Sequence, residues 1–167
     1  VSVTICQIMG LRSARNAGLE VDKQVIDRAV TYVRACQNPD GGFRYQRDGG
    51  QSGWPRSAAG LASLYYAGIY EDRAIDRGLQ YLSVTAIPGN EASRSHVWYG
   101  HYYAVQAMFL SGGRNWAQWW PLIAGHLLNI QNNNGSWDDR SVGQAYGTSM
   151  ALLILQMPKR YLPIFQK

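Results

Sequence analysis

Apolar residues recur along most of this 167-residue chain with the spacing of an α-helix. Three stretches each carry a single apolar stripe, in which the apolar positions lie three and four residues apart. Such a stripe is typical of a helix that buries one face and exposes the other. The stripes consist of Val25, Ile26, Ala29, Val30, Val33 and Cys36, then of Ile75, Leu79 and Leu82, and finally of Trp116, Trp120, Ile123, Leu127 and Ile130.

Polar residues and one proline indicate where these helices begin. Asp22 precedes the first stripe and suits an N-cap. Glu71 and Asp72 precede the second stripe, where negative charge is favourable because a helix N-terminus carries a partial positive charge. Pro121 lies within the third stripe and predicts a helix start or a kink, because proline lacks a backbone N–H.

Four other stretches are apolar or small on nearly every side, and they alternate with the amphipathic ones. They span residues 3–17, 57–69, 98–111 and 146–157. A helix without a polar face is buried on more than one side. Because no stretch alternates apolar and polar residues as a strand does, the sequence predicts an all-α fold.

The alternation is an internal repeat. A small or polar residue stands seven positions before Leu or Met at intervals of roughly 44 to 53 residues, which is the length of two helices and their loops. The repeated pairs are Thr4 and Leu11, Ser57 and Leu64, His101 and Met108, and Thr148 and Leu155.

Two loops also recur. "QNPDGGF" (37–43) and "QNNNGSW" (131–137) each end an amphipathic stretch with glutamine, a turn, glycine and an aromatic residue. Asparagine and glycine favour the turn because they tolerate a positive φ or make local side-chain bonds. The corresponding segment 83–96 of the middle unit has neither the glutamine nor the aromatic residue.

These loops carry a resemblance to a known family. The pattern Q-x-x-x-G-x-W resembles the QW repeat of squalene and oxidosqualene cyclases, and "QNPDGGF" is similar to the glycine-rich loop of protein prenyltransferase β-subunits. "AYGTSMALLIL" (145–155) resembles the start of an inner helix after such a loop. The resemblance covers essentially the whole chain.

The resemblance implies an α/α toroid, in which an inner and an outer ring of helices surround a central apolar cavity. The chain would supply about three hairpins and one further inner helix, hence a partial ring. Residues 1–167 are predicted to form one repeat domain, which we expect to be the C-terminal part of a longer chain. In the family the glutamine bonds a neighbouring helix end while the aromatic ring covers the junction. The implied clasp residues are Gln37, Gly42, Phe43, Gln131, Gly135 and Trp137.

The catalytic patterns of the family are missing from the matching positions. Class II terpene cyclases use an aspartic acid in D-x-D-D before an inner helix, where this chain has "QAYG", "GWPR" and "VWYG". The zinc of prenyltransferases is held by Asp, Cys and His, but the matching histidine position falls on Gly100, and His101 follows it. Asp138 and Asp139 are expected to cap a helix. The sequence therefore predicts no metal site and no cofactor, and it assigns no catalytic residue.

Aromatic residues remain as candidates for ligand binding. In the family such rings line an isoprenoid cavity, although ordinary core packing is an equally open interpretation here. The candidate lining residues are Tyr65, Tyr66, Trp98, Tyr99, His101 and Tyr102, and Tyr103 lies beside them. Arg44, Arg47 and Arg56 flank the first loop and either meet a diphosphate or lie in solvent.

Composition changes this picture little. The net charge of +5 is not clustered, so nucleic acid is not an expected partner, and no apolar run is long enough to span a membrane. Cys6 and Cys36 form no CxxC pair, and both are expected to be buried. The compartment is not predicted.

Three functions remain open at this stage. The first is a non-catalytic domain that binds an apolar, isoprenoid or lipid-like ligand or a partner domain. The second is part of a cyclase or prenyltransferase whose catalytic residues lie elsewhere, and the third is a structural interaction module. One terminal inner helix, 3–17 or 146–157, is expected to lack a neighbour, and the N-terminal face is expected to stay open to missing residues or to a second subunit. The tail 158–167, with Tyr161, Leu162, Ile164 and Phe165, is expected to fold back over the last helix.

Overall fold

The computed structural model describes residues 1–161. These residues form seven α-helices and one short 3₁₀-helix, with no strand among them, which confirms the all-α prediction. The helices are α1 (Ser2–Asn16), α2 (Lys23–Ala35), α3 (Trp54–Tyr66), α4 (Arg73–Thr85), α5 (Val97–Ser111), α6 (Gly113–Asn129), α7 (Gln144–Leu155) and η1 (Met157–Lys159).

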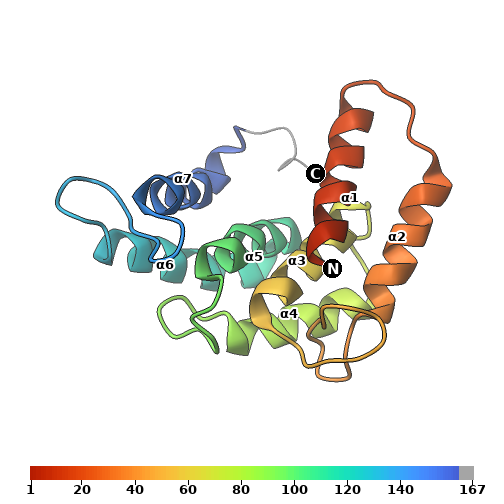
Figure 1. Ribbon diagram of the computed structural model, residues 1–167, viewed down its shortest axis with the longest axis horizontal. Coiled ribbons are helices and arrows are strands. Elements are labelled where there is room, and N and C mark those ends of the chain that lie inside the picture. Colours follow the sequence, from red (N-terminus) through yellow and green to blue (C-terminus); the bar gives the residue numbers. More distant parts are fainter. Residues whose placement is uncertain (162–167) are drawn as a thin grey trace.

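The helices form two layers (Figure 1). One layer, the inner row, consists of α1, α3, α5 and α7, and each of these helices packs against the next in that order. The other layer, the outer row, consists of α2, α4 and α6, which pack against α3 and α5 from outside. Helices that alternate along the chain therefore alternate between the two rows. Closure into a toroid stays a prediction.

The number of buried residues in an inner-row helix depends on whether the helix lies in the middle or at the end of the row. Eleven of the thirteen residues of α3 and ten of the fifteen residues of α5 are buried. The end helices α1 and α7 have only two and three buried residues. All four sequences are apolar or small on nearly every side, but α1 and α7 each have an inner-row neighbour on one side alone. In the described structure, no further inner-row helix covers the side of α1 that faces away from α3 or the side of α7 that faces away from α5.

Local sequence signals position the helix starts. The Asp22 carboxylate accepts a hydrogen bond from the Gln24 N–H, and that of Asp72 accepts one from the Ala74 N–H, as N-caps do. Pro121 does not start a helix, because α6 begins at Gly113 and continues through the proline. The predicted helix start at Pro121 was therefore wrong, and the alternative, a kink, stays a prediction.

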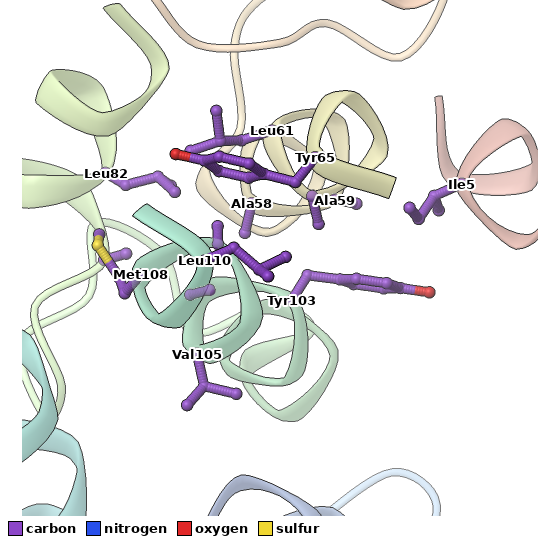
Figure 2. Packing of buried hydrophobic residues seen from close by; sticks show 14 of the residues in the cluster. Ile5, Ala58, Ala59, Leu61, Tyr65, Leu82, Tyr103, Val105, Met108 and Leu110 are labelled. Atoms are coloured by element: carbon purple, nitrogen blue, oxygen red, sulfur yellow. The ribbon is translucent and has the colours of Figure 1, made fainter. Parts of the chain in front are cut away.

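The core lies between the two middle helices of the inner row and their neighbours. Figure 2 shows Leu61 and Tyr65 of α3 on one side and Met108 and Leu110 of α5 on the other, with Leu82 of α4 beside them. Burial of such side chains is the main favourable contribution to folding. The core is therefore centred on α3 and α5, the two inner-row helices that have a neighbouring helix on both sides.

Glycine permits a close approach on α5. The ring of Trp54, which is buried, lies directly on Gly100, and a Cβ at this position would overlap the ring. The indole N–H of Trp54 donates to the Ser93 carbonyl, so the ring is fixed by this hydrogen bond as well as by its contact with Gly100. The sequence resemblance matches Gly100 with a histidine position, and the Trp54 ring fills the space that such a side chain would occupy.

Replacing Gly100 with alanine is therefore expected to destabilise the protein by about 1–3 kcal/mol, because the added methyl group must displace a packed indole. Gly10 of α1 has open space around it, and Gly10→Ala is the matched control. That control is expected to be neutral or slightly stabilising, since alanine favours helix. Urea unfolding measures both; an equal effect of the two substitutions would contradict the packing.

Two other expectations concern single residues and the tail. Cys36 is buried as predicted, but Cys6 is exposed, so the prediction was wrong for Cys6, whose helix α1 has an inner-row neighbour on one side only. Tyr161 is also exposed, and the predicted contacts of Leu162, Ile164 and Phe165 lie outside the described residues. Within residues 1–161, no helix is both long and apolar enough to cross a membrane.

Candidate functional site

The first loop (37–43) and the last loop (131–137) place their aromatic residues in the same way. The Phe43 N–H donates to the Ser57 hydroxyl oxygen at 2.7 Å, and the Trp137 N–H donates to that of Thr148 at 3.0 Å. Ser57 and Thr148 are equivalent positions of the repeat, at the starts of α3 and α7. Each loop is thereby fixed to the inner helix that follows it.

The aromatic side chains close the junction between an outer and an inner helix. Phe43 is fully buried on Gly60 of α3. Trp137 is also buried, and its indole N–H donates to the Leu127 carbonyl near the end of α6 at 2.8 Å. Carbonyls at a helix C-terminus lack partners within the helix, so this bond stabilises the end of α6.

The two glutamines differ in their partners. The Gln37 amide donates to the carbonyls of Gly41 and Ala74, and its oxygen accepts from Arg77, so it joins the first loop to α4. The Gln131 amide donates to the Gly135 carbonyl in its own loop. Of the two glutamines, only Gln37 therefore bonds another helix in the described structure. Gly42 packs against Ser52 and the Tyr81 ring.

The middle unit has a buried, hydrogen-bonded pair of side chains where the units of the first and last loops use a hydroxyl. His101 occupies the repeat position of Ser57 and Thr148, and its Nε2 lies 2.7 Å from Glu91 Oε1. Glu91 belongs to the segment that has no QW-like loop, and its side chain is inaccessible to solvent. Trp54 and Trp119 flank the imidazole ring, with ring centroids 4.9 and 5.9 Å away.

The Glu91 carboxylate is ionised at neutral pH. Burial alone raises its pKa, but hydrogen bonds from His101 and from the backbone N–H groups of Glu91 and Gly89, with the charge of His101, outweigh this and lower the pKa to about 2. Since the carboxylate only accepts, His101 Nε2–H is the donor. A carboxyl group with this pKa is not a proton donor for an alkene.

The six candidate lining residues do not face one cavity among the described residues. Tyr65 points from α3 toward the side of α4, and Tyr103 of α5 points in the opposite direction (Figure 2). Tyr66 faces α1, with the Arg12 guanidinium 5.6 Å from its ring centre. His101 is held by Glu91. Burial raises the pKa of Tyr65 to about 12 and raises the pKa values of Tyr66, Tyr99 and Tyr102.

A hollow of about 910 Å³ lies beside the N-terminal ends of α5 and α7. Two of the six candidates, Trp98 and Tyr99, line it together with Tyr146, while the other four do not. Tyr99 packs edge-on against Tyr103, and Tyr102 does the same, so this part of α5 is a cluster of aromatic rings. The hollow is within the size range of small-molecule sites.

Charged groups surround the aromatic wall of the hollow. Arg94, Arg140 and Asp138 line it, and so do Glu91 and His126. Burial lowers the pKa of His126, with the positive charges nearby acting in the same direction and Glu91 opposing them. The hollow therefore combines aromatic surface with charges of both signs.

The remaining charged candidates have structural partners. Arg44 donates to the Ala35 carbonyl, and Arg56 donates to those of Phe43 and Gln51, so neither guanidinium is directed to a phosphate site. Arg47 is exposed beside Asp48.

The aspartates after the last loop do not cap α7. Its N-cap is Gly143, and no side chain bonds there. The Asp139 carboxylate instead accepts from the N–H groups of Ser141 and Val142, which makes a turn before the helix. The N-cap prediction was wrong. Within residues 1–161, no three His, Cys, Asp or Glu side chains gather as metal ligands would.

Comparison with protein-family models, with curated proteins and with solved structures finds no match to this chain. The likeness to terpenoid cyclases and prenyltransferases therefore depends on the loops and on the helical repeat alone.

Proposed function

We propose that this chain is a non-catalytic, repeat-built binding domain of the terpenoid cyclase and prenyltransferase type. Its ligand is an apolar, isoprenoid- or lipid-like molecule, and its site is the hollow beside the N-terminal ends of α5 and α7. The observation that carries this proposal is the joint lining of that hollow by Trp98, Tyr99 and Tyr146. Large aromatic side chains offer the apolar surface on which an isoprenoid chain packs.

The surroundings of the hollow support a ligand with one polar end. Arg94 and Arg140 lie on its lining beside the aromatic wall, and both can donate hydrogen bonds to a hydroxyl or carbonyl oxygen. A few polar groups around a mainly apolar wall are typical of small-molecule sites. An isoprenoid alcohol combines the two properties.

The alternative, part of a cyclase or prenyltransferase enzyme, has less support from the described residues. Glu91 is the buried carboxyl group nearest the hollow, and a pKa of about 2 keeps it from acting as the acid of a cyclase. Trp54 fills the space at Gly100 where a zinc-binding histidine is expected. Binding without chemistry is therefore the function we favour.

Farnesol is expected to bind saturably, as measured by the change in tryptophan fluorescence on titration. Tyr146→Ala should weaken binding by about tenfold, because it removes one aromatic wall, whereas Tyr146→Phe should bind nearly as well as the natural chain. Tyr70→Ala is the matched control, since Tyr70 lines a different hollow with Tyr65.

Two outcomes would contradict the assignment of this site. Unsaturable partitioning of farnesol, equal in all variants, would show that the protein has no site for it. Loss of binding in Tyr70→Ala with retention in Tyr146→Ala would place the ligand in the hollow beside Tyr65.

A further inference from the structure

A second hollow lies between α1, α2 and the end of α3. Its volume is about 450 Å³, which is within the size range of small-molecule sites. It shares no lining residue with the hollow beside the N-terminal ends of α5 and α7. The two hollows are therefore separate, and the second one has its own chemistry.

The apolar part of this wall is mainly aliphatic. Tyr66 is the one aromatic residue of the lining, whereas the first hollow has several. A flexible hydrocarbon chain suits such a wall, because each methylene group that leaves water adds to the free energy of binding. The aliphatic lining residues are all half-buried, and they are Leu11, Val21, Ile26, Ala67 and Ile69.

The charged part of the wall is positive. Three basic residues and one acidic residue line the hollow, namely Arg12, Arg15, Lys23 and Asp27. The acidic residue is already paired, because Asp27 Oδ2 lies 2.6 Å from Lys23 Nζ. Arg12 and Arg15 are three residues apart on α1 and hence lie on one face of that helix. Within residues 1–161, Arg15 makes no ion pair, so its charge is available to an anion.

Tyr66 adds a buried hydroxyl group to the lining. The residue is 5% exposed, and its hydroxyl group has no hydrogen-bond partner among the described residues. Burial raises the pKa of Tyr66 well above its ordinary value, so the hydroxyl keeps its proton at neutral pH. The Arg12 guanidinium lies 5.6 Å from the ring centre and donates to the Tyr65 carbonyl, which fixes it beside the ring. A buried donor without an acceptor is unusual, and a ligand oxygen supplies one.

We propose that this hollow binds an aliphatic monocarboxylate, the chemical class of a medium-chain fatty acid. The hydrocarbon chain lies along the aliphatic wall, and the carboxylate accepts from the Tyr66 hydroxyl beside the guanidinium groups of Arg12 and Arg15. A carboxylate suits these donors because it only accepts hydrogen bonds and because charged partners make the stronger ones. The site does not depend on the isoprenoid-like ligand proposed for the first hollow.

Isothermal titration calorimetry of the full chain with decanoate, below its micelle concentration, tests this site. Decanoate is expected to bind saturably, with one molecule per chain. Decanol should bind at least about tenfold more weakly, because it lacks the charge that the guanidinium groups attract. Acetate and decylamine should not bind measurably, since the first has no hydrocarbon chain and the second has the wrong charge. Equal binding of decanoate and decylamine would overturn the proposal.

Two variants locate the carboxylate. Tyr66→Phe should weaken decanoate binding by about tenfold without lowering the melting temperature, because the hydroxyl that it removes has no partner in the folded chain. Arg15→Glu should weaken binding by about tenfold or more, because it replaces an attractive charge with a repulsive one. Arg28→Glu is the matched control, since Arg28 is exposed on α2 and does not line the hollow, and it should leave binding unchanged.

Further outcomes decide against the site. Absence of saturable decanoate binding would overturn it, and so would binding that Tyr66→Phe and Arg15→Glu leave unchanged. Competition with farnesol distinguishes the two hollows, because decanoate should bind equally well in its presence. Decanoate binding that is lost in Tyr146→Ala but retained in Arg15→Glu would place the carboxylate in the first hollow and would also contradict the proposal.

Discussion

Replacing Trp137 with alanine is expected to lower the free energy of unfolding by about 3–5 kcal/mol, the cost typical of a large aromatic residue removed from a packed site. The side chain is 3% exposed, and its indole N–H satisfies the Leu127 carbonyl at the end of α6. The substitution therefore opens a cavity and leaves a buried acceptor unpaired, and both effects destabilise. The melting temperature should fall by roughly 10 °C or more.

Two further variants separate the contributions of Trp137. Trp137→Phe keeps a ring but loses the indole N–H, so its cost should lie between those of the natural chain and the alanine variant. Trp120→Ala is the control for loss of an indole elsewhere, since Trp120 is only partly buried and stacks on Trp116 at the surface of α6. Equal melting temperatures for Trp120→Ala and Trp137→Ala would show that the last loop does not hold α6 to α7.

Replacing His101 with alanine is expected to cost about 3–5 kcal/mol, because the buried Glu91 carboxylate loses its side-chain hydrogen-bond donor and keeps only backbone N–H donors and the Arg94 guanidinium, which lies 3.9 Å from its Oε2. The two side chains are 2% and 0% exposed. Glu91→Ala should cost a similar amount. The double variant should cost clearly less than the two single costs added, because each single variant already breaks the same pair.

The pH dependence of the free energy of unfolding provides a second test of the Glu91–His101 pair. The folded-state pKa of Glu91 is lowered from 4.5 to about 2, so its contribution to stability is complete above about pH 5 and is lost as the pH falls toward 2. The natural chain should therefore lose its stability advantage over Glu91→Gln across this range. The loss is of the order of 3 kcal/mol. A difference between the two proteins that stays constant from pH 7 to pH 3 would contradict the assigned ionisation.

The repeat and its loops were predictable because their signals are local. Glutamine, glycine and an aromatic residue at fixed spacing define the first and last loops, and the helical stripes of α2, α4 and α6 define the outer row. Asp22 was recognisable as an N-cap, and Asp72 as a favourable charge at a helix start, for the same reason. These features depend on residues that are close in the sequence.

The site was less predictable because its determinants are not local. The inner helices are apolar on every side, so periodicity does not tell which way Tyr65 and Tyr66 point. The Glu91–His101 pair joins a turn without a motif to a helix ten residues later, and the repeat alignment marked the position of His101 but gave no signal for Glu91. Pro121 was compatible with a helix start or a kink, and the sequence alone did not show that α6 begins eight residues before it.

The proposed function places an isoprenoid-like ligand against the first turns of α5 and α7, and hydrogen–deuterium exchange with and without saturating farnesol tests this placement most directly. Amides in residues 97–101 and 144–148 should exchange more slowly with farnesol, because these segments carry the aromatic wall of the hollow. The amides of α2 and of the loop around Tyr70 should be unchanged. Protection confined to the region of Tyr65 and Tyr70, or no protection at a concentration that saturates the fluorescence change, would contradict the proposed site.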